Sequence, residues 1–239
     1  MKVALFVTCL ADHYLADAAA DAVRLLRHLG CEVDFPPQQT CCGQPAHNAG
    51  QVKEARTMAE HTLKVFSEAE AVVVPSGSCA AMVRNTYPTL FDSADGRPSA
   101  LSRKTFELGE FLVRNLGVRA LGSGLSGRRV AVHQGCHALR ELRLTDEPRL
   151  LLEGAGAEVV PWPAQEECCG FGGLFSVKMT DVSAAMADRK LDTLPDVDWI
   201  VTGDGGCLLH LEGRSRARDT GYAFRHLASA LWEGVHGGP

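Results

Sequence analysis

The residues of this chain that could do chemistry are its cysteines, which form two matching sets. Eight of the nine cysteines recur in the same order and spacing in each half of the chain. In each set, one cysteine precedes an adjacent pair by the same interval, and the interval from the pair to the last cysteine differs by a single position between the halves. The sets are Cys9, Cys41, Cys42 and Cys79, and Cys136, Cys168, Cys169 and Cys207. In a reducing compartment, such clusters bind metal or do redox chemistry.

The cysteine spacing belongs to a tandem repeat in which Cys9 corresponds to Cys136. A glycine follows each adjacent pair, Gly43 in the first half and Gly170 in the second. Two such triplets, each with an upstream and a downstream cysteine at matching distances, are not a chance pattern. The ninth cysteine, Cys31, has an alanine as its counterpart. Because free cysteine is a common small core residue, we expect Cys31 to be structural.

Composition and charge exclude several classes of function. The net charge is −5 and no long basic stretch is present, which argues against nucleic acid as a partner. Arg214, Arg216 and Arg218 form a short basic cluster that we expect to be solvated. No apolar run approaches the roughly 18 residues of a transmembrane helix, and the apolar N-terminal stretch is too short for a signal peptide. We therefore expect a cytoplasmic protein without a transmembrane segment.

Alternating strands and helices predict the α/β fold class. We expect two pseudo-symmetric repeats, each a small parallel sheet flanked by helices, with domains at 1–120 and 128–239. The glycine-rich loop 117–127 joins them, and 93–102 is a second loop. The predicted strands are 2–8, 32–35, 71–75, 129–133, 158–161 and 199–202. The predicted helices are 12–29, 51–68, 80–90, 105–116, 137–154, 174–191 and 217–235.

Every paired cysteine follows a predicted strand. In parallel α/β sheets, ligand sites lie outside the carboxyl ends of the strands. The eight cysteines should therefore gather at this edge of each sheet, and we expect the two edges to face one another or a shared cleft. The positive ends of the helices that start there would stabilise thiolate and sulfide charge.

Four thiolates in each half can bind a tetrahedral zinc ion, a [4Fe–4S] cluster or a [2Fe–2S] cluster. The adjacent pairs favour a cluster, because neighbouring Cα atoms are only about 3.8 Å apart and two sulfurs on one small ion constrain the backbone. In a cluster, the two sulfurs can bind separate iron atoms, which relieves that constraint. Gly43 and Gly170 then fit positions where the backbone turns sharply.

Several motifs resemble the cysteine-rich CCG-domain family, which includes the cysteine-rich component of heterodisulfide reductase, the iron–sulfur subunit of glycolate oxidase and the lactate-utilisation A proteins. The match covers nearly the whole chain and is strongest with the lactate-utilisation A branch. It rests on FVTCLAD at 6–12, CCGQPA at 41–46, PSGSC at 75–79 and CCGFGG at 168–173. The resemblance implies an iron–sulfur component, with [4Fe–4S] favoured, that transfers electrons in a complex oxidising L-lactate to pyruvate. Lactate-utilisation proteins B and C are the implied partners.

The chain departs from the family pattern at one position in each half. Ser76 and Asp204 stand where the fuller motif has the first cysteine of a terminal CxxC pair. In the heterodisulfide reductase relatives this pair helps to bind a non-cubane cluster, so that assignment loses support here. A conventional four-cysteine cluster, a cluster completed by Ser76 or Asp204, and a site occupied only in a complex stay open.

Other residues near the cysteine loops are weaker candidates. His137 follows Cys136 directly and could ligate, although a helix-start histidine that bonds to backbone is the simpler interpretation. His47, His133 and His210 also lie near these loops. Two other functions remain open: a zinc-stabilised binding protein without redox activity, and a thiol–disulfide oxidoreductase that uses the strained adjacent cysteines. The substrate, be it lactate, glycolate or a disulfide, does not follow from the residues.

Overall fold

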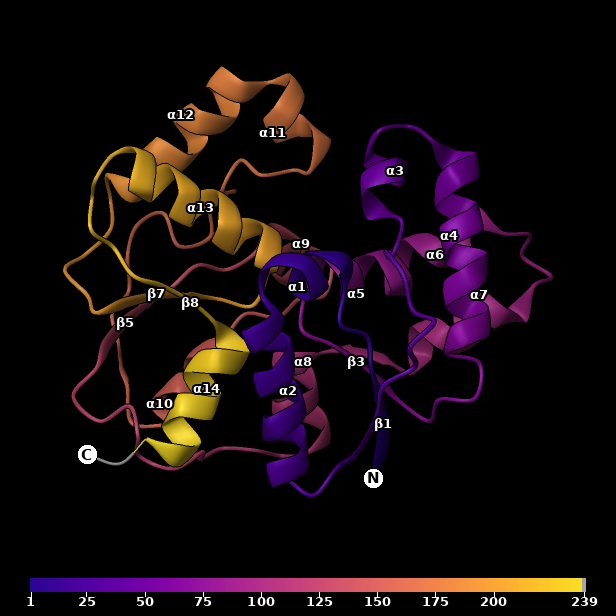
Figure 1. Cartoon of the computed structure of the whole chain (residues 1–239), viewed down its shortest axis with the longest axis horizontal. Helices are drawn as coiled ribbons and strands as arrows, with labels where there is room; N and C mark the ends of the chain where they lie inside the picture. The colour runs from indigo at the N-terminus through magenta and orange to yellow at the C-terminus, as the bar shows by residue number, and fades with distance from the viewer. Residues whose placement is uncertain (238–239) are drawn as a thin grey trace.

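The computed structural model describes residues 1–237, so the last two residues of the predicted second domain lie outside it. Short parallel strands alternate with helices along this range (Figure 1). The strands are β1 (Lys2–Leu5), β2 (Glu32–Asp34), β3 (Val72–Val74), β4 (Thr105–Glu107), β5 (Arg129–Val132), β6 (Glu158–Val159), β7 (Trp199–Thr202) and β8 (Phe224–His226).

The helices of the first half are α1 (Cys9–Tyr14), α2 (Ala16–His28), α3 (Gln44–Asn48), α4 (Val52–Val65), α5 (Gly77–Ala81), α6 (Tyr87–Leu90), α7 (Gly96–Arg103) and α8 (Leu108–Glu110). Two π-helical turns, η1 (Met82–Thr86) and η2 (Phe111–Asn115), extend α5 and α8. The helices of the second half are α9 (Cys136–Arg140), α10 (Glu147–Glu153), α11 (Leu174–Lys178), α12 (Thr180–Leu191), α13 (Gly205–Ala217) and α14 (Leu227–His236).

The strands form two four-stranded parallel sheets with the same topology. The order is β2-β1-β3-β4 in the first sheet and β6-β5-β7-β8 in the second. The central pairs correspond: Ala4 of β1 lies opposite Val72 of β3, and Ala131 of β5 lies opposite Ile200 of β7. The prediction of an α/β fold with two pseudo-symmetric parallel sheets is confirmed. Because both sheets are parallel, the loops that follow their strands gather at one edge of each sheet.

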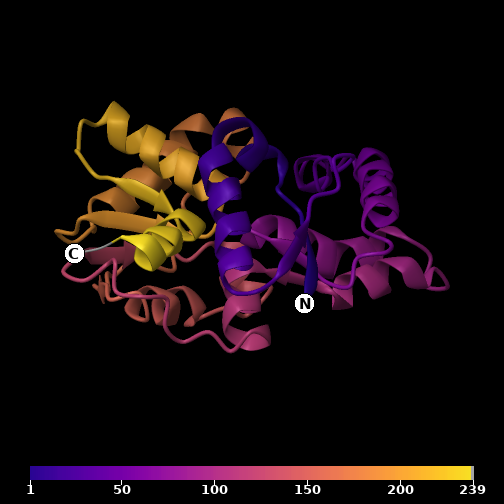
Figure 2. The ribbon, with the colours of Figure 1, turned by 60° about the horizontal axis from the view of Figure 1, so that its bottom comes forward.

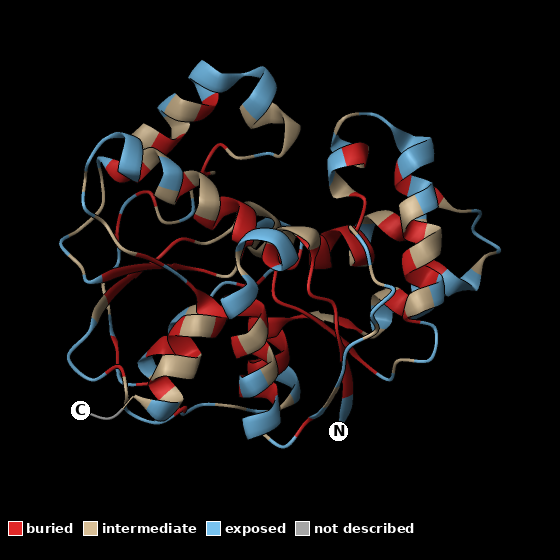
Figure 3. Ribbon diagram, viewed as in Figure 1, coloured by how far each residue is buried: buried red, intermediate tan, exposed pale blue. Residues whose placement is uncertain are grey.

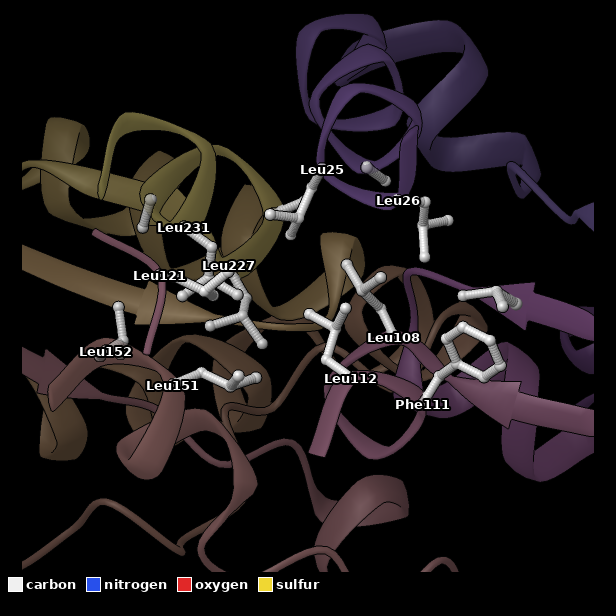
Figure 4. Close-up of a cluster of buried hydrophobic side chains, with 14 of the residues drawn as sticks. Leu25, Leu26, Leu108, Phe111, Leu112, Leu121, Leu151, Leu152, Leu227 and Leu231 are labelled. Carbon is white, nitrogen blue, oxygen red and sulfur yellow. The ribbon is translucent and has the colours of Figure 1, made fainter. Parts of the chain in front are cut away.

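The two halves share a hydrophobic core. Helix α2 of the first half packs against α14 of the second (Figure 1, Figure 2). Leu25 and Leu26 of α2, Leu227 and Leu231 of α14, and Leu112 of η2 belong to one buried cluster (Figure 4). This joint core holds the sheets in a fixed relation. The division into domains at 1–120 and 128–239 stays a prediction.

The other face of each sheet has its own core. Phe6 and Phe66 pack together in the first half with ring centroids 5.2 Å apart. Cys169, Leu191 and Cys207 belong to a separate cluster in the second half. The central strands β1, β3, β5 and β7 are largely buried, and the helices expose their outer faces (Figure 3). The buried cysteines of each set therefore belong to the core of their own half, Cys42 and Cys79 to the first and Cys169 and Cys207 to the second.

The fourth strand of each sheet was not expected from the sequence. Residues 105–116 and 217–235 are not single helices, because each range contains a strand, β4 or β8, before a helix. These strands have three residues each and run directly into a helix, so no apolar alternation marks them.

Four further element predictions are wrong in extent or continuity. The helix predicted at 12–29 is interrupted at Leu15, which separates α1 from α2. Residues 93–102 are not all loop, since α7 begins at Gly96. The helix predicted at 137–154 is two helices, α9 and α10, with a turn between them. The helix predicted at 174–191 is interrupted at Met179, which separates α11 from α12.

Candidate metal centre

The fold places each paired cysteine at a strand–helix junction. Cys9 and Cys136 are the first residues of α1 and α9, which follow β1 and β5. Cys79 and Cys207 are the third residues of α5 and α13, which follow β3 and β7. Helices α5 and α9 touch, as do α1 and α13, so these junctions meet between the two halves (Figure 1).

One cavity of about 170 Å³ joins the two cysteine sets. Its volume is below the roughly 300–1,000 Å³ typical of sites for drug-sized ligands. A compact inorganic group fits this lining better than a large organic substrate, because many of the residues that converge on it are thiols. The cysteines that line it are Cys9, Cys41, Cys42, Cys79, Cys136, Cys168, Cys169 and Cys207.

Within the first half, the sulfurs of the adjacent pair have different partners. Cys41 Sγ lies 3.6 Å from Cys9 Sγ, whereas Cys42 Sγ lies 3.3 Å from Cys79 Sγ. All nine cysteines are free thiols. Cys31 is buried in the shared core and does not line the cavity. Its position agrees with the structural role expected for it.

The second half repeats part of this geometry. Cys169 Sγ lies 3.3 Å from Cys207 Sγ, which matches the Cys42–Cys79 pair. Cys136 Sγ lies 3.6 Å from Nδ1 of His137, whose Nε2 is 3.5 Å from a carboxylate oxygen of Glu141. His137 therefore lies beside the sulfur of Cys136, at the rim of the same cavity.

The glycine after each cysteine pair is required by the backbone. Gly43 has a φ of 86° and Gly170 a φ of 91°, in the left-handed region that favours glycine. A Cβ atom on Gly170 would lie 2.7 Å from the carbonyl oxygen of Ser183. Each glycine also directs its backbone N–H toward a cysteine sulfur at 3.4 Å, Cys41 in one half and Cys168 in the other. The sharp turn predicted at both positions is present.

Side chains from neighbouring helices fasten the two cysteine loops. Tyr87 donates a hydrogen bond from its hydroxyl to the carbonyl oxygen of Cys42 at 2.8 Å. In the second half, the hydroxyl of Ser183 donates to the carbonyl oxygen of Gly170 at 2.7 Å and lies 3.2 Å from Nε2 of His210. Equivalent loops are thus held by different residues.

One thiol in each set ionises readily. Hydrogen bonds from Cys42 and then Cys9, with help from the N–H of Gly43, lower the pKa of Cys41 to about 3. Hydrogen bonds from Cys136 and Cys169 likewise lower the pKa of Cys168 to about 2. Thiolate is the form that ligates metal, so each half offers an anionic sulfur at neutral pH.

Ser76 and Asp204 occupy equivalent cap positions and meet across the two halves. Ser76 caps α5, with its hydroxyl oxygen accepting a hydrogen bond from the N–H of Cys79 at 3.4 Å. Asp204 caps α13 through the N–H of Gly206 at 3.2 Å. Its second carboxylate oxygen accepts from the N–H of Ser78 at 2.8 Å and from the hydroxyl of Ser76 at 3.3 Å. Both side chains line the cavity while they cap helices.

His133 lies beneath the second cysteine set. The residue is 1% exposed, and neither ring nitrogen makes a well-formed hydrogen bond within residues 1–237, although a backbone contact with Gln165 opposes the fall in its pKa. Burial, followed by the nearby charge of Lys190, lowers the pKa of His133 to about 3, so the ring is neutral. Leaving a buried polar group unpaired costs roughly 1–3 kcal/mol. A ring nitrogen of His133 and the sulfurs of Cys169 and Cys207 all lie within 4.8 Å of one another, as potential metal ligands do.

Lys190 is a buried cation that the sequence pattern does not reveal. Its ammonium donates hydrogen bonds to the carbonyl oxygens of Ala164 and Glu167 and lies 4.5 Å from the centroid of the Trp162 ring. Burial lowers its pKa to about 8, while the nearby Cys169 opposes that shift. One feature of the sequence could have indicated this burial: the lysine immediately precedes Leu191, on the face of α12 that points inward. Its charge stabilises thiolates in the second half.

Comparison with known proteins places the chain in a family. A model of the cysteine-rich CCG domain matches residues 3–84 and 130–212, which are the two repeats. The chain is 43% identical to lactate utilization protein A of Geobacillus sp. strain WCH70, covering 97% of this chain and 99% of that protein. It is 44% identical to the protein of the same name from Geobacillus kaustophilus strain HTA426, covering 97% and 98%.

Comparison with solved structures supports the fold and nothing beyond it. A crystal structure of a hypothetical protein from Helicobacter pylori superimposes with a TM-score of 0.66 at 11% identity. All of this chain is covered, but it spans only 49% of that protein. The domain matches and the near full-length identities together show that the chain belongs to the cysteine-rich CCG-domain family, in the branch of lactate utilization protein A.

Proposed function

We propose that this chain holds an iron–sulfur centre in each half and transfers electrons in the oxidation of L-lactate to pyruvate. The observation that carries the proposal is the single cavity on which all eight repeated cysteines converge. Lactate utilisation is the role in the printed names of the relatives with 43% and 44% identity. Oxidising lactate to pyruvate releases two electrons and two protons, so a component of that system needs a redox-active group.

The donor set fits an iron–sulfur centre. Each half offers four cysteine sulfurs, the number that a [4Fe–4S] or [2Fe–2S] cluster takes. Sulfurs of the adjacent pair lie against different cysteines, so each can reach a separate iron atom. When bound, such a centre supplies one-electron transfer. The ligands in the first half would be Cys9, Cys41, Cys42 and Cys79, and in the second Cys136, Cys168, Cys169 and Cys207.

The protein itself supplies charge and shielding at this site. Helices begin at Cys9 and Cys136, so their positive ends lie beside these sulfurs, and Lys190 adds a cation in the second half. The inner sulfurs are shielded from water, because Cys42, Cys79, Cys169 and Cys207 are buried. Among residues 1–237, no helix has both the length and the apolar character to cross a membrane. We propose that the partners are lactate-utilisation proteins B and C, in the cytoplasm.

A zinc site is the second candidate, and the sulfur distances are compatible with it. Two thiolates on one tetrahedral zinc ion, with bonds of about 2.3 Å, lie about 3.8 Å apart. The observed separations of 3.3 and 3.6 Å are close to this value. Zinc has no redox chemistry, so it would make the chain a structural or binding component rather than an electron carrier.

Anaerobic purification of the whole chain with metal and sulfide analysis tests the proposal. We expect iron and acid-labile sulfide in equal amounts, with broad visible absorption that is bleached by dithionite. Zinc in both halves without sulfide would contradict it. Reduction of a disulfide substrate by metal-free protein, with no iron bound under any condition, would instead indicate a thiol–disulfide oxidoreductase.

A further inference from the structure

The two cysteine sets differ at one buried position of the repeat. His133 in the second half corresponds to Phe6 in the first, because each stands three positions before the first cysteine of its set. Their backbones are equivalent, because the N–H of Phe6 donates to the carbonyl of Val73 and that of His133 donates to the carbonyl of Val201. Phe6 packs on Phe66 within an apolar core. His133 has a polar ring in the same place.

The imidazole of His133 lacks the partners that a structural histidine would have. Both ring nitrogens are buried and neither makes a well-formed hydrogen bond within the described part of the chain, since the backbone of Gln165 provides only a marginal contact. Buried polar groups in folded proteins are nearly always paired, so an unpaired ring points to a partner that the polypeptide does not supply. The sulfurs of Cys169 and Cys207 are 3.3 Å apart, and each lies within 4.8 Å of one nitrogen of this ring.

We propose that His133 ligates the metal centre of the second half through a ring nitrogen, beside Cys169 and Cys207. The proposal rests on the proposed function and deepens it, since it makes the two centres chemically different. The first half offers four thiolates and a phenyl ring, whereas the second offers four thiolates and a neutral imidazole.

Pulsed electron paramagnetic resonance on anaerobically reconstituted whole chain tests this ligation. We expect a strongly coupled nitrogen signal that changes its splitting when the protein is grown with ¹⁵N-histidine. This measurement uses the unmodified protein and so does not depend on the folding of a variant. His133→Phe, which installs the first-half residue, should lose the signal.

His137→Phe is the matched control, because His137 is the other histidine beside a cysteine of the second set. It should keep the coupled nitrogen. Iron–sulfur centres that show no histidine nitrogen coupling, or that keep it in His133→Phe, would overturn the proposal while leaving the proposed function intact. A chain that binds no iron or sulfide would overturn both.

Discussion

The first and second cysteine sites share a scaffold but differ in what surrounds their sulfurs. Both follow the same sheet order, and both have Cys–Cys–Gly turns with a positive φ at the glycine. Apolar residues such as Phe6 and Phe66 back the first site. His133 and Lys190 lie beneath the second, in a neutral and a cationic form.

This difference distinguishes the features that are needed to bind a metal centre from those that adjust the reduction potential of a bound centre. Cysteines, glycines and strand ends recur in both halves, because ligand number and backbone geometry must be met twice. The buried residues around the cysteines can differ between the halves, because they change the charge near the site and not the number of cysteine ligands. A nearby cation favours the reduced form of a centre, and in a protein interior its effect is weakly screened. The second site should therefore accept electrons before the first.

Removing one buried cysteine from either set should give the largest effect. We expect Cys42→Ala or Cys169→Ala to lose about half of the bound iron, because a four-cysteine cluster loses one ligand in one half only. Iron and sulfide assays on anaerobically purified protein measure this. Cys31→Ala is the matched control and should keep full iron content, since Cys31 does not line the cavity. Unchanged iron in both site variants would refute the ligand assignment.

Thiol reactivity of the metal-free chain should separate the cysteines within each set. The pKa values of Cys41 and Cys168 are about 3 and about 2, so both remain thiolates as the pH falls from 8 to 5. A thiol with the ordinary pKa near 9 loses about tenfold in thiolate fraction per pH unit over that range. Alkylation followed by mass spectrometry should find nearly constant rates at Cys41 and Cys168. A tenfold fall per unit at both would contradict the hydrogen-bonding pattern.

Replacing the buried lysine should alter the second site alone. Lys190→Met keeps the length of the side chain but removes its charge, so the potential of one centre should fall while iron content is retained. Metal-free protein should lose about 1–3 kcal/mol of unfolding free energy, because the carbonyls of Ala164 and Glu167 lose their donor. Redox and urea titrations measure the two effects. A shift in both centres would contradict a charge effect confined to one half.

The smallest effects should come from the residues that fasten the loops. Tyr87→Phe removes the donor to the Cys42 carbonyl, and Ser183→Ala removes the donor to the Gly170 carbonyl. Each should cost about 1 kcal/mol of unfolding free energy. Each should also speed the loss of iron from its own half during dialysis against a chelator. Equal acceleration in both halves by one variant would show that the loops are not independent.

The sequence predicted the scaffold well because its signals repeat. The constant offset between the cysteine sets and the apolar strands were enough to predict two parallel sheets with Cys9 and Cys136 at their carboxyl edges. The apolar runs at 71–75 and 199–202 located the third strand of each sheet, and Cys79 and Cys207 follow these strands. β4 and β8 escaped prediction because three residues followed directly by a helix carry no periodicity.

The residues that make the two sites different were harder to predict from the sequence, because their surroundings depend on tertiary packing. His133 could be placed near a cysteine loop, but its lack of hydrogen-bond partners within residues 1–237 is a tertiary property. Lys190 stands among residues of an ordinary helix, and only packing shows that its charge is buried. The contact of Asp204 with Ser76 crosses the two halves, which no local pattern records.

An anaerobic redox titration of the reconstituted chain, followed by electron paramagnetic resonance, tests the central claim most directly. Two centres of different potential should be reduced in two separate steps. Cys42→Ala should retain only the step at higher potential, which belongs to the second half, and Cys169→Ala only the step at lower potential. A single step in the wild-type chain, or the same step remaining in both variants, would contradict the account.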